Sequence, residues 1–182
     1  MVKRITIPLI DEEIRSLRAG DSVLLFGRIY TGRDAAHKRL CDLLKEGKPL
    51  PVPVKDMAIY YAGPCPAKPG DPIGSCGPTT SYRMDAYAPT LMREGLRVMI
   101  GKGFRNEEVV AAMKETGSVY LAATGGAGAL IAQCVKSARV LAFEDLGTEA
   151  IRELIVEDFP LIVAIDSLGN DLYATGPEAY RR

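Results

Sequence analysis

The chain has 182 residues, with 23 basic and 23 acidic side chains and a hydrophobic fraction of 47 %. This length suits one large domain or two small ones, and that hydrophobic fraction supplies a core and argues against disorder. The formal charge of zero gives no general attraction to nucleic acid or to an acidic membrane, so we expect neither as a partner. The sequence shows neither the run of about 20 apolar residues that spans a membrane nor a signal peptide, so we expect a cytoplasmic protein.

Stretches rich in β-branched and aromatic residues alternate with helical patterns. The β-rich stretches predict strands over residues 22–30, 57–62, 97–100, 118–122, 138–143 and 160–165. Apolar side chains at helical spacing predict helices over residues 33–46, 79–95, 106–116 and 149–156. Because strands and helices alternate in the second half and no linker divides the chain, we expect one α/β domain over residues 1–182.

A loop over residues 63–78 contains five prolines and four glycines. A long loop without secondary structure is usually either functional or disordered, and prolines lower the entropy cost of ordering it. One interpretation is a rigid surface connection, and the other is a loop that shapes a ligand site. The residues that follow the loop favour the second interpretation.

Three polar residues lie where the first predicted strand passes into a helix, namely Arg33, Asp34 and His37. A carboxylate at this position suits the free N–H groups and the dipole of the helix. Asp34 and His37 share a helical face and could pair, and Arg33 could hold a carboxylate in a two-pronged contact. The alternative is that Asp34 only caps the helix, Arg33 is a surface charge and His37 is a packed side chain.

Hydroxyl residues and a cation open the next predicted helix. Thr79, Thr80 and Ser81 follow Gly77-Pro78, and Arg83 lies one turn after Thr79. Free N–H groups with hydroxyls and an arginine can form an anion site, although a threonine that caps a helix is the ordinary alternative.

Glycines mark two further strand ends. Lys102 lies between two glycines directly after a predicted strand, where α/β sheets commonly bind ligands. The segment 124–129 is glycine-rich but lacks both common phosphate-loop patterns, so we expect close backbone packing or N–H groups that line a site. Arginines, a lysine and hydroxyls together suit a small dicarboxylate.

The cysteines, at positions 41, 65, 76 and 134, have no metal-site spacing, and His37 is the single histidine. A zinc site needs about four ligands, usually in close pairs. We therefore expect free thiols and no metal bound by this chain. A cluster on Cys41, Cys65 and Cys76 is the alternative, but no spacing supports it.

Five motifs together resemble one family. GRDAAH (32–37), YYAGPCP (60–66), GPTTSYRMDAY (77–87), GKG (101–103) and ATGGAGAL (123–130) occur in the order found in class I, iron–sulfur-dependent fumarate hydratases and the related L-tartrate dehydratases. The match is to their β subunit, or to the C-terminal domain of fused members. The resemblance implies a swivelling β/β/α domain with three layers.

The resemblance also implies site residues and partners. Arg33, Arg83 and Lys102 would bind the substrate carboxylates together with Thr80, Thr79 would act as the base, and Asp34 and His37 would orient Arg33 or its neighbours. A [4Fe–4S] cluster would be carried by a partner α subunit, in a hetero-oligomer such as α2β2, and this chain would be inactive without that partner. The reaction would be the reversible hydration of fumarate to L-malate. In the dehydration direction, iron would act as a Lewis acid on the hydroxyl that leaves malate.

Two other functions stay open at this point. An L-tartrate dehydratase β subunit would use the same residues, since its substrate differs from malate by one hydroxyl. A non-catalytic domain that binds small anions and regulates a partner belongs to another class of function, and it would not need the α chain for a reaction.

Overall fold

The computed structural model describes residues 2–181. The strands of this part of the chain are β1 (Lys3–Ile7), β2 (Ser22–Thr31), β3 (Ala58–Tyr60), β4 (Val98–Gly101), β5 (Val119–Ala122), β6 (Val135–Ala142) and β7 (Ile151–Ile165). The α-helices are α1 (Asp11–Ser16), α2 (Asp34–Lys45), α3 (Ala88–Arg93), α4 (Glu107–Thr116), α5 (Gly128–Cys134) and α6 (Leu172–Thr175). Short 3-10 helices are η1 (Ser81–Met84), η2 (Glu144–Glu149) and η3 (Gly176–Tyr180).

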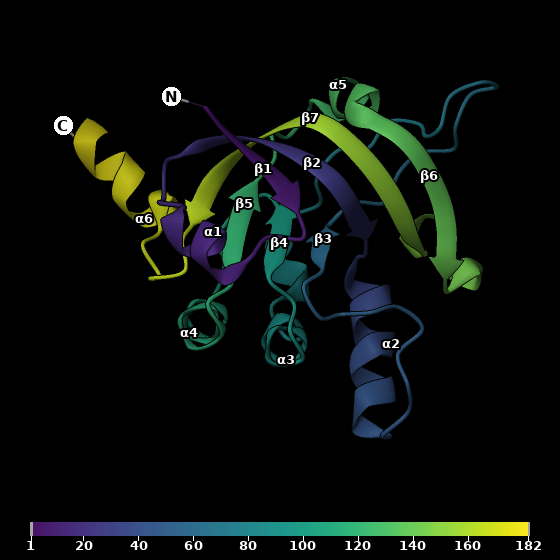
Figure 1. The fold of residues 1–182 in the computed structure, drawn as a ribbon, viewed down its shortest axis with the longest axis horizontal. Coiled ribbons are helices and arrows are strands. Elements are labelled where there is room, and N and C mark those ends of the chain that lie inside the picture. Colours follow the sequence, from purple (N-terminus) through teal and green to yellow (C-terminus); the bar gives the residue numbers. More distant parts are fainter. Residues whose placement is uncertain (1, 182) are drawn as a thin grey trace.

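The seven strands of the described chain form one mixed sheet in the order β1-β2-β3-β4-β5-β7-β6. Strands β2, β3, β4 and β5 are parallel neighbours, while β7 runs antiparallel to both β2 and β5. Because β7 pairs with both β2 and β5, the sheet curves and closes on itself. Figure 1 shows the result: β2, β6 and β7 arch over one face of β3–β5, and α2, α3 and α4 lie on the other side.

The short parallel strands are buried on both faces. In β4, Val98 and Ile100 pack into the apolar cluster that includes residues of β1, β2 and β7, whereas Met99 packs into the cluster that includes residues of α2, α3 and α4. Tyr120 of β5 likewise joins the second cluster, between two neighbours that join the first. Burial on both faces explains why these strands are almost continuously apolar and were easy to predict from sequence.

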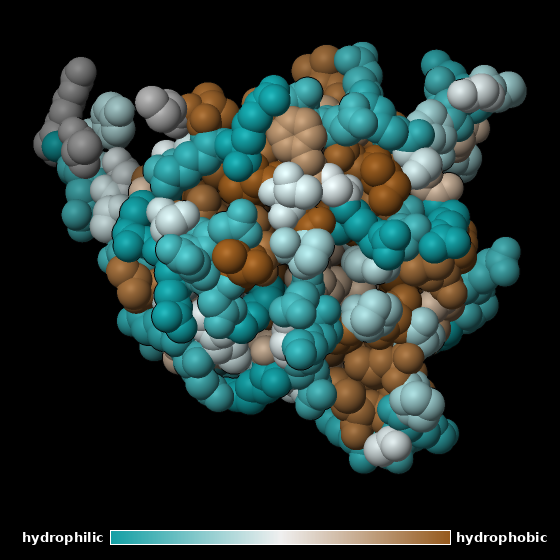
Figure 2. Space-filling model, in the orientation of Figure 1, coloured by the Kyte–Doolittle hydropathy of each residue, from teal (hydrophilic) through white to brown (hydrophobic). Residues whose placement is uncertain are grey.

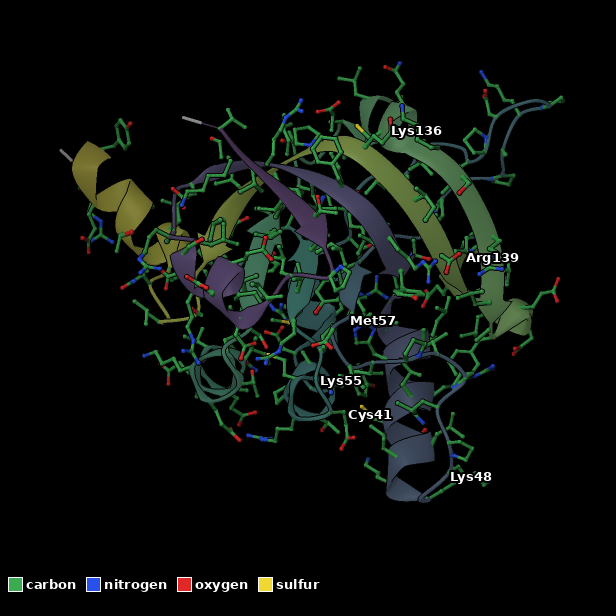
Figure 3. The ribbon with its side chains drawn as sticks, viewed as in Figure 1. Cys41, Lys48, Lys55, Met57, Lys136 and Arg139 are labelled. Atoms are coloured by element: carbon green, nitrogen blue, oxygen red, sulfur yellow. The ribbon has the colours of Figure 1, made fainter. Side chains whose placement is uncertain are left out.

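The prediction of a helix over residues 149–156 is wrong, because most of this segment forms the first half of β7. Ile151, Leu154 and Ile155 have helical spacing, but the chain pairs with β6 on one side and β2 on the other. Glu153 accepts ion pairs from both neighbours, from Arg139 of β6 at 2.8 Å and from Arg28 of β2 at 3.2 Å. Figure 3 labels Arg139 on β6. Pairing on both edges outweighs the local pattern.

Other boundaries differ less from prediction. Helix α2 and the Asn106-capped helix α4 agree with the sequence, and the Asn106 side chain accepts a hydrogen bond from Val109 N at 2.8 Å. The helix expected over residues 79–95 is divided into η1 and α3. On the face drawn in Figure 2, hydrophobic residues gather over α2. Leu44 and Leu50 are partly buried against the cluster that includes residues of α2, α3 and α4. No helix within residues 2–181 is long and apolar enough to cross a membrane.

Candidate active site

The parallel strands bring the sequence motifs to one edge of the sheet. Arg33 follows β2, the segment 61–63 follows β3, Lys102 follows β4 and the glycine-rich segment 124–128 follows β5. Because parallel strands point the same way, their carboxyl ends meet at the same edge, where open α/β sheets bind ligands. The common placement of these motifs is therefore a property of the topology.

Asp34 lies between two guanidinium groups at this edge. Its Oδ2 accepts a hydrogen bond from Arg83 Nη2 at 2.9 Å, and its Oδ1 lies 3.8 Å from Arg33 Nε. Arg33 also pairs through Nη2 with Glu149 Oε1 at 3.2 Å. The structure thus brings together Arg33, Asp34 and Arg83, which the sequence separates by up to 50 positions.

Glu149 also belongs to the group around Asp34, although no sequence pattern pointed to it. Besides its ion pair with Arg33, its Oε2 accepts a hydrogen bond from Ala35 N at 3.2 Å, in the first turn of α2. A carboxylate here is stabilised by the free N–H groups at the start of a helix. Glu149 belongs to η2, more than a hundred residues away from Arg33, and no local motif marks it.

His37 supports the turn before α2 from inside the protein. Its Nδ1 lies 2.8 Å from the carbonyl oxygen of Arg33, which can only accept, so Nδ1 carries the proton. The residue is completely buried, and burial lowers the pKa of His37 from 6.5 to about 4. The expected pair between Asp34 and His37 does not form, because the Asp34 carboxylate bonds to Arg83 while the imidazole bonds to backbone.

Thr79 and Thr80 lie where the long loop enters η1. Thr79 N donates to Tyr61 O at 2.6 Å, which ties Thr79 to the end of β3. Thr80, not Thr79, occupies the position before η1, and its side chain makes no capping hydrogen bond. Capping therefore does not account for either hydroxyl at this place.

Lys102 is joined to the same segment by backbone pairing. Thr80 and Lys102 form an isolated parallel bridge, and Ser81 N donates to Lys102 O at 2.9 Å. The Lys102 side chain passes beside the glycine-rich segment: its Nζ lies 3.5 Å from the place that a Cβ on Gly125 would occupy. The residues 80–83 thus connect the Lys102 turn to the group around Asp34.

Both ends of the proline-rich loop contact this edge. At its start, Arg33 packs against Gly63, where a Cβ would lie 3.0 Å from Arg33 Nη1. Near its end, Cys76 N donates to Gly128 O at 3.0 Å, and a Cβ on Gly128 would lie 2.9 Å from Gly77 N. The expected close backbone packing of the glycine-rich segment is confirmed, and the two ends of the loop pack against Arg33 and Gly128.

The cysteines do not form a metal-ligand set. The described residues contain no group of three or more His, Cys, Asp or Glu side chains that could hold a metal ion. Cys41 and Cys76 are buried in different apolar clusters, and Cys65 is exposed. Burial raises the pKa of Cys76 to about 12, which disfavours the thiolate form that a metal would bind. The residues present therefore do not fit the ligands of an iron–sulfur cluster.

The chain is similar to known hydro-lyases. The family model described as Fumarase C-terminus matches residues 1–176. The chain is 44 % identical over 151 residues to the anaerobic class I fumarate hydratase of Escherichia coli, a match that covers 82 % of this chain and 28 % of that protein. It is 37 % identical over 170 residues to fumarate hydratase 2 of Leishmania major, a match that covers 92 % of this chain and 30 % of that protein.

A third relative has nearly the same length as this chain. This is "Putative L(+)-tartrate dehydratase subunit beta" of Methanocaldococcus jannaschii, 41 % identical over 171 residues, which cover 91 % of this chain and 88 % of that protein. By contrast, the chain spans less than a third of the two fumarate hydratases. The family model covers all seven strands and the residues around Asp34, Thr79 and Lys102. This chain therefore belongs to the Fumarase C-terminus family.

Proposed function

We propose that this chain is the β part of a [4Fe–4S]-dependent hydro-lyase that reversibly hydrates fumarate to L-malate. The observation that carries the proposal is the group of Arg33, Asp34 and Arg83, held beside the Lys102 turn at the edge where the parallel strands end. The names of the relatives support the same reaction class.

The chain would form one domain over residues 1–182, of the swivelling β/β/α type. Two apolar clusters on opposite faces of β3–β5 support this description. An α subunit would complete the site in a hetero-oligomer such as α2β2 and would carry the cluster, since the cysteines of this chain do not fit that task. This chain alone would be inactive and cytoplasmic.

The cations would bind the carboxylates of a small dicarboxylate. Asp34 takes one hydrogen bond from Nη2 of Arg83, so the other N–H groups of that guanidinium can point at a substrate carboxylate. Lys102 would supply a second positive charge, and Thr80 a hydroxyl. Positive groups fixed in advance stabilise the charge that develops on a carboxylate when the neighbouring carbon loses a proton.

Thr79 would take that proton. A hydroxyl is a weak base, and nearby cations are needed to favour its deprotonated form; Arg83 lies four positions further along the chain. Asp34 would orient Arg33 and Arg83, and neutral His37 would hold the Arg33 carbonyl. Glu149 joins this list as a second carboxylate that pairs with Arg33.

A tartrate dehydratase β subunit is the second candidate, because the relative of matching length carries that name. Tartrate has one hydroxyl more than malate, and discrimination of a hydroxyl depends on buried polar partners. The α part would provide some of these partners.

Reconstitution with the α subunit tests both candidates. The anaerobically assembled pair should be assayed with L-malate, fumarate and both tartrate enantiomers, together with the Arg83→Gln variant and an Arg93→Gln control. Arg93 is an exposed arginine of α3 that pairs with Glu115. We expect turnover only when both subunits are present. Arg83→Gln should lose this turnover, and the Arg93→Gln control should keep it. Binding of dicarboxylates without any hydration or dehydration would instead identify a regulatory anion-binding domain.

A further inference from the structure

A buried arginine that the proposed reaction does not use links the segments that carry the proposed site residues. The Arg105 side chain has no solvent exposure, and its Nε donates to Asp85 Oδ1 at 2.7 Å. Its Cζ lies 5.0 Å from the ring centre of Tyr120 and 5.4 Å from that of Tyr61. Burial opposes the charge on Arg105, but Tyr61 and Asp85 outweigh it and raise its pKa, so the group stays a cation.

The Arg105–Asp85 pair joins the two segments that carry the proposed site residues. Asp85 lies two positions after Arg83, and Arg105 three positions after Lys102. Asp85 Oδ2 also accepts a hydrogen bond from Asn106 N at 2.8 Å, so both oxygens of the carboxylate are held by the second segment. The two segments are thus joined at their far ends by this pair and at their near ends by the bridge between Thr80 and Lys102.

A chain of hydrogen bonds lies between the Arg105–Asp85 pair and the bridge of Thr80 with Lys102. Lys102 N donates to Ser81 Oγ at 3.1 Å, and the Tyr120 hydroxyl donates to Gly103 O at 3.0 Å. Since the single proton of Tyr120 is used there, Ser81 must donate in the 2.8 Å contact between the two hydroxyls. The Lys102 turn is therefore held on both sides by Ser81 and Tyr120, and Arg105 packs on the ring of Tyr120.

Stability alone is a poor explanation for this arrangement. Arg105 Nη2 and the Tyr61 hydroxyl are both buried without a hydrogen-bond partner within the described chain. Such groups cost free energy, and a buried ion pair is often no more stabilising than well-packed neutral side chains. The pair does, however, connect the turn of Lys102 with the segment of Thr79 and Arg83.

We propose that Arg105 is a positioning residue, which fixes Lys102 relative to the segment 79–85 through Asp85 and the rings of Tyr61 and Tyr120. The catalytic consequence rests on the proposed function, because that function gives Lys102, Thr79 and Arg83 their roles. The structural consequence does not: without Arg105, the two segments should open from each other more often while the rest of the sheet stays closed.

Amide hydrogen exchange on the full chain measures this opening directly. The test variant is Arg105→Met with Asp85→Asn, which removes both charges at similar side-chain volume. The amide oxygen at position 85 can still accept the hydrogen bond that Asn106 N donates. The matched control is Arg97→Met with Asp11→Asn, which removes an ion pair of 2.7 Å between α1 and the residue before β4. Arg105→Lys keeps the charge but cannot reproduce the planar contact with Asp85 and the rings, and it carries the test if the double variant does not fold.

We expect the amides of Ser81 and Lys102 to exchange about tenfold faster in the test variant, with Leu25 of β2 unchanged as the internal reference. Arg105→Lys should give a smaller increase, and the control variant none at these two amides. Unchanged exchange at Ser81 and Lys102, or an equal increase at Leu25, would overturn the proposal.

The reconstituted pair separates this inference from the proposed function. If Arg105 positions Lys102, the KM for L-malate should rise about tenfold in the test variant, and Arg105→Lys should recover part of the loss. Faster exchange at Ser81 and Lys102 with an unchanged KM for L-malate would count against the proposed function and would leave the structural role of Arg105 intact. Normal exchange with a raised KM would count against Arg105 as a positioning residue.

Discussion

His37 is the only histidine of the chain, and its burial makes the free energy of unfolding depend on pH. Burial lowers its pKa from 6.5 to about 4 in the folded protein. Between these values the unfolded chain binds more protons than the folded one, so stability is lost as the pH falls through this window. The imidazole that donates to the Arg33 carbonyl is therefore neutral at neutral pH, and acid destabilises the fold by favouring its protonated form in the unfolded chain.

A urea titration at two pH values tests this property of His37. Between pH 7 and pH 5, the wild type should lose about 2 kcal/mol more unfolding free energy than His37→Asn, which can donate to the same carbonyl but does not titrate. Carboxylates contribute equally to both proteins, so the difference reports His37. Equal losses in the two proteins would show that His37 is not held neutral.

Thr79 offers a second test at the scale of single residues. Because it caps no helix, Thr79→Ala should change the unfolding free energy by less than about 0.5 kcal/mol. If Thr79 is the base, the same change should lower kcat of the reconstituted pair by about 10²–10⁴-fold. Thr79→Ser should keep part of the activity, since it retains the hydroxyl but loses the methyl group that restricts its rotamer.

An exposed threonine provides the control for that series. Thr90→Ala, on α3, should leave both kcat and stability unchanged. Near-normal kcat in Thr79→Ala would place the base in the α subunit and would restrict this chain to holding the carboxylates.

The site residues that sequence could predict are those in local motifs. Arg33, Thr79 and Lys102 each lie beside a glycine or proline, and Asp34 and Arg83 lie in the same short motifs; such positions are visible without a structure. Partners such as Glu149 and Arg105 could not be found in this way. Their contacts with Arg33 and Asp85 depend on tertiary packing, and charged residues of this kind are common on any surface.

At the scale of elements, prediction succeeded where local pattern and burial agree. The strands β2–β5 and the helices α2 and α4 are of this kind. Prediction failed for the first half of β7. There Ile151, Leu154 and Ile155 have the spacing of a helical face, but pairing with β2 and β6 decides the conformation. Only the closed arrangement of the sheet supplies both neighbours.

The end of β4 provides a test at this scale, because Gly101 has no room for a side chain. A Cβ there would lie 2.8 Å from Tyr61 Cδ2 and closer still to Ser81 Oγ. Gly101→Ala should therefore lower the unfolding free energy by about 1–3 kcal/mol through overpacking. It should also displace Ser81 from Lys102 N.

Gly176→Ala is the matched control. Its nearest neighbour would be Leu172 at 3.8 Å, an ordinary contact, and its backbone is helical. This change should leave stability unaltered or raise it by up to about 1 kcal/mol. Chemical denaturation of both variants provides the comparison, and equal stabilities would contradict the tight packing at Gly101.

At the scale of the whole molecule, one topological feature accounts for the site. The parallel strands β2, β3, β4 and β5 end at one edge. Each is followed by a motif that contributes a cation, a hydroxyl or a tightly packed stretch of backbone. The two buried thiols lie apart from each other: Cys76 belongs to the cluster that includes residues of β1, β2 and β7, and Cys41 to the cluster that includes residues of α2–α4. The sheet thus separates Cys76 from Cys41.

This separation predicts the outcome of cluster reconstitution on the isolated chain. A [4Fe–4S] cluster needs about four ligands, mostly thiolates, but Cys41 and Cys76 are buried in different clusters and burial raises the pKa of both thiols. Three cysteines could converge on iron only if the core opened. The folded chain, treated anaerobically with iron and sulfide, should therefore show no cluster absorbance above that of Cys65→Ala, which lacks the exposed thiol. The α subunit treated in the same way should acquire the cluster, and the pair should then become active. A stoichiometric cluster signal from this chain alone, lost in Cys65→Ala, would overturn the assignment of the cluster to the partner.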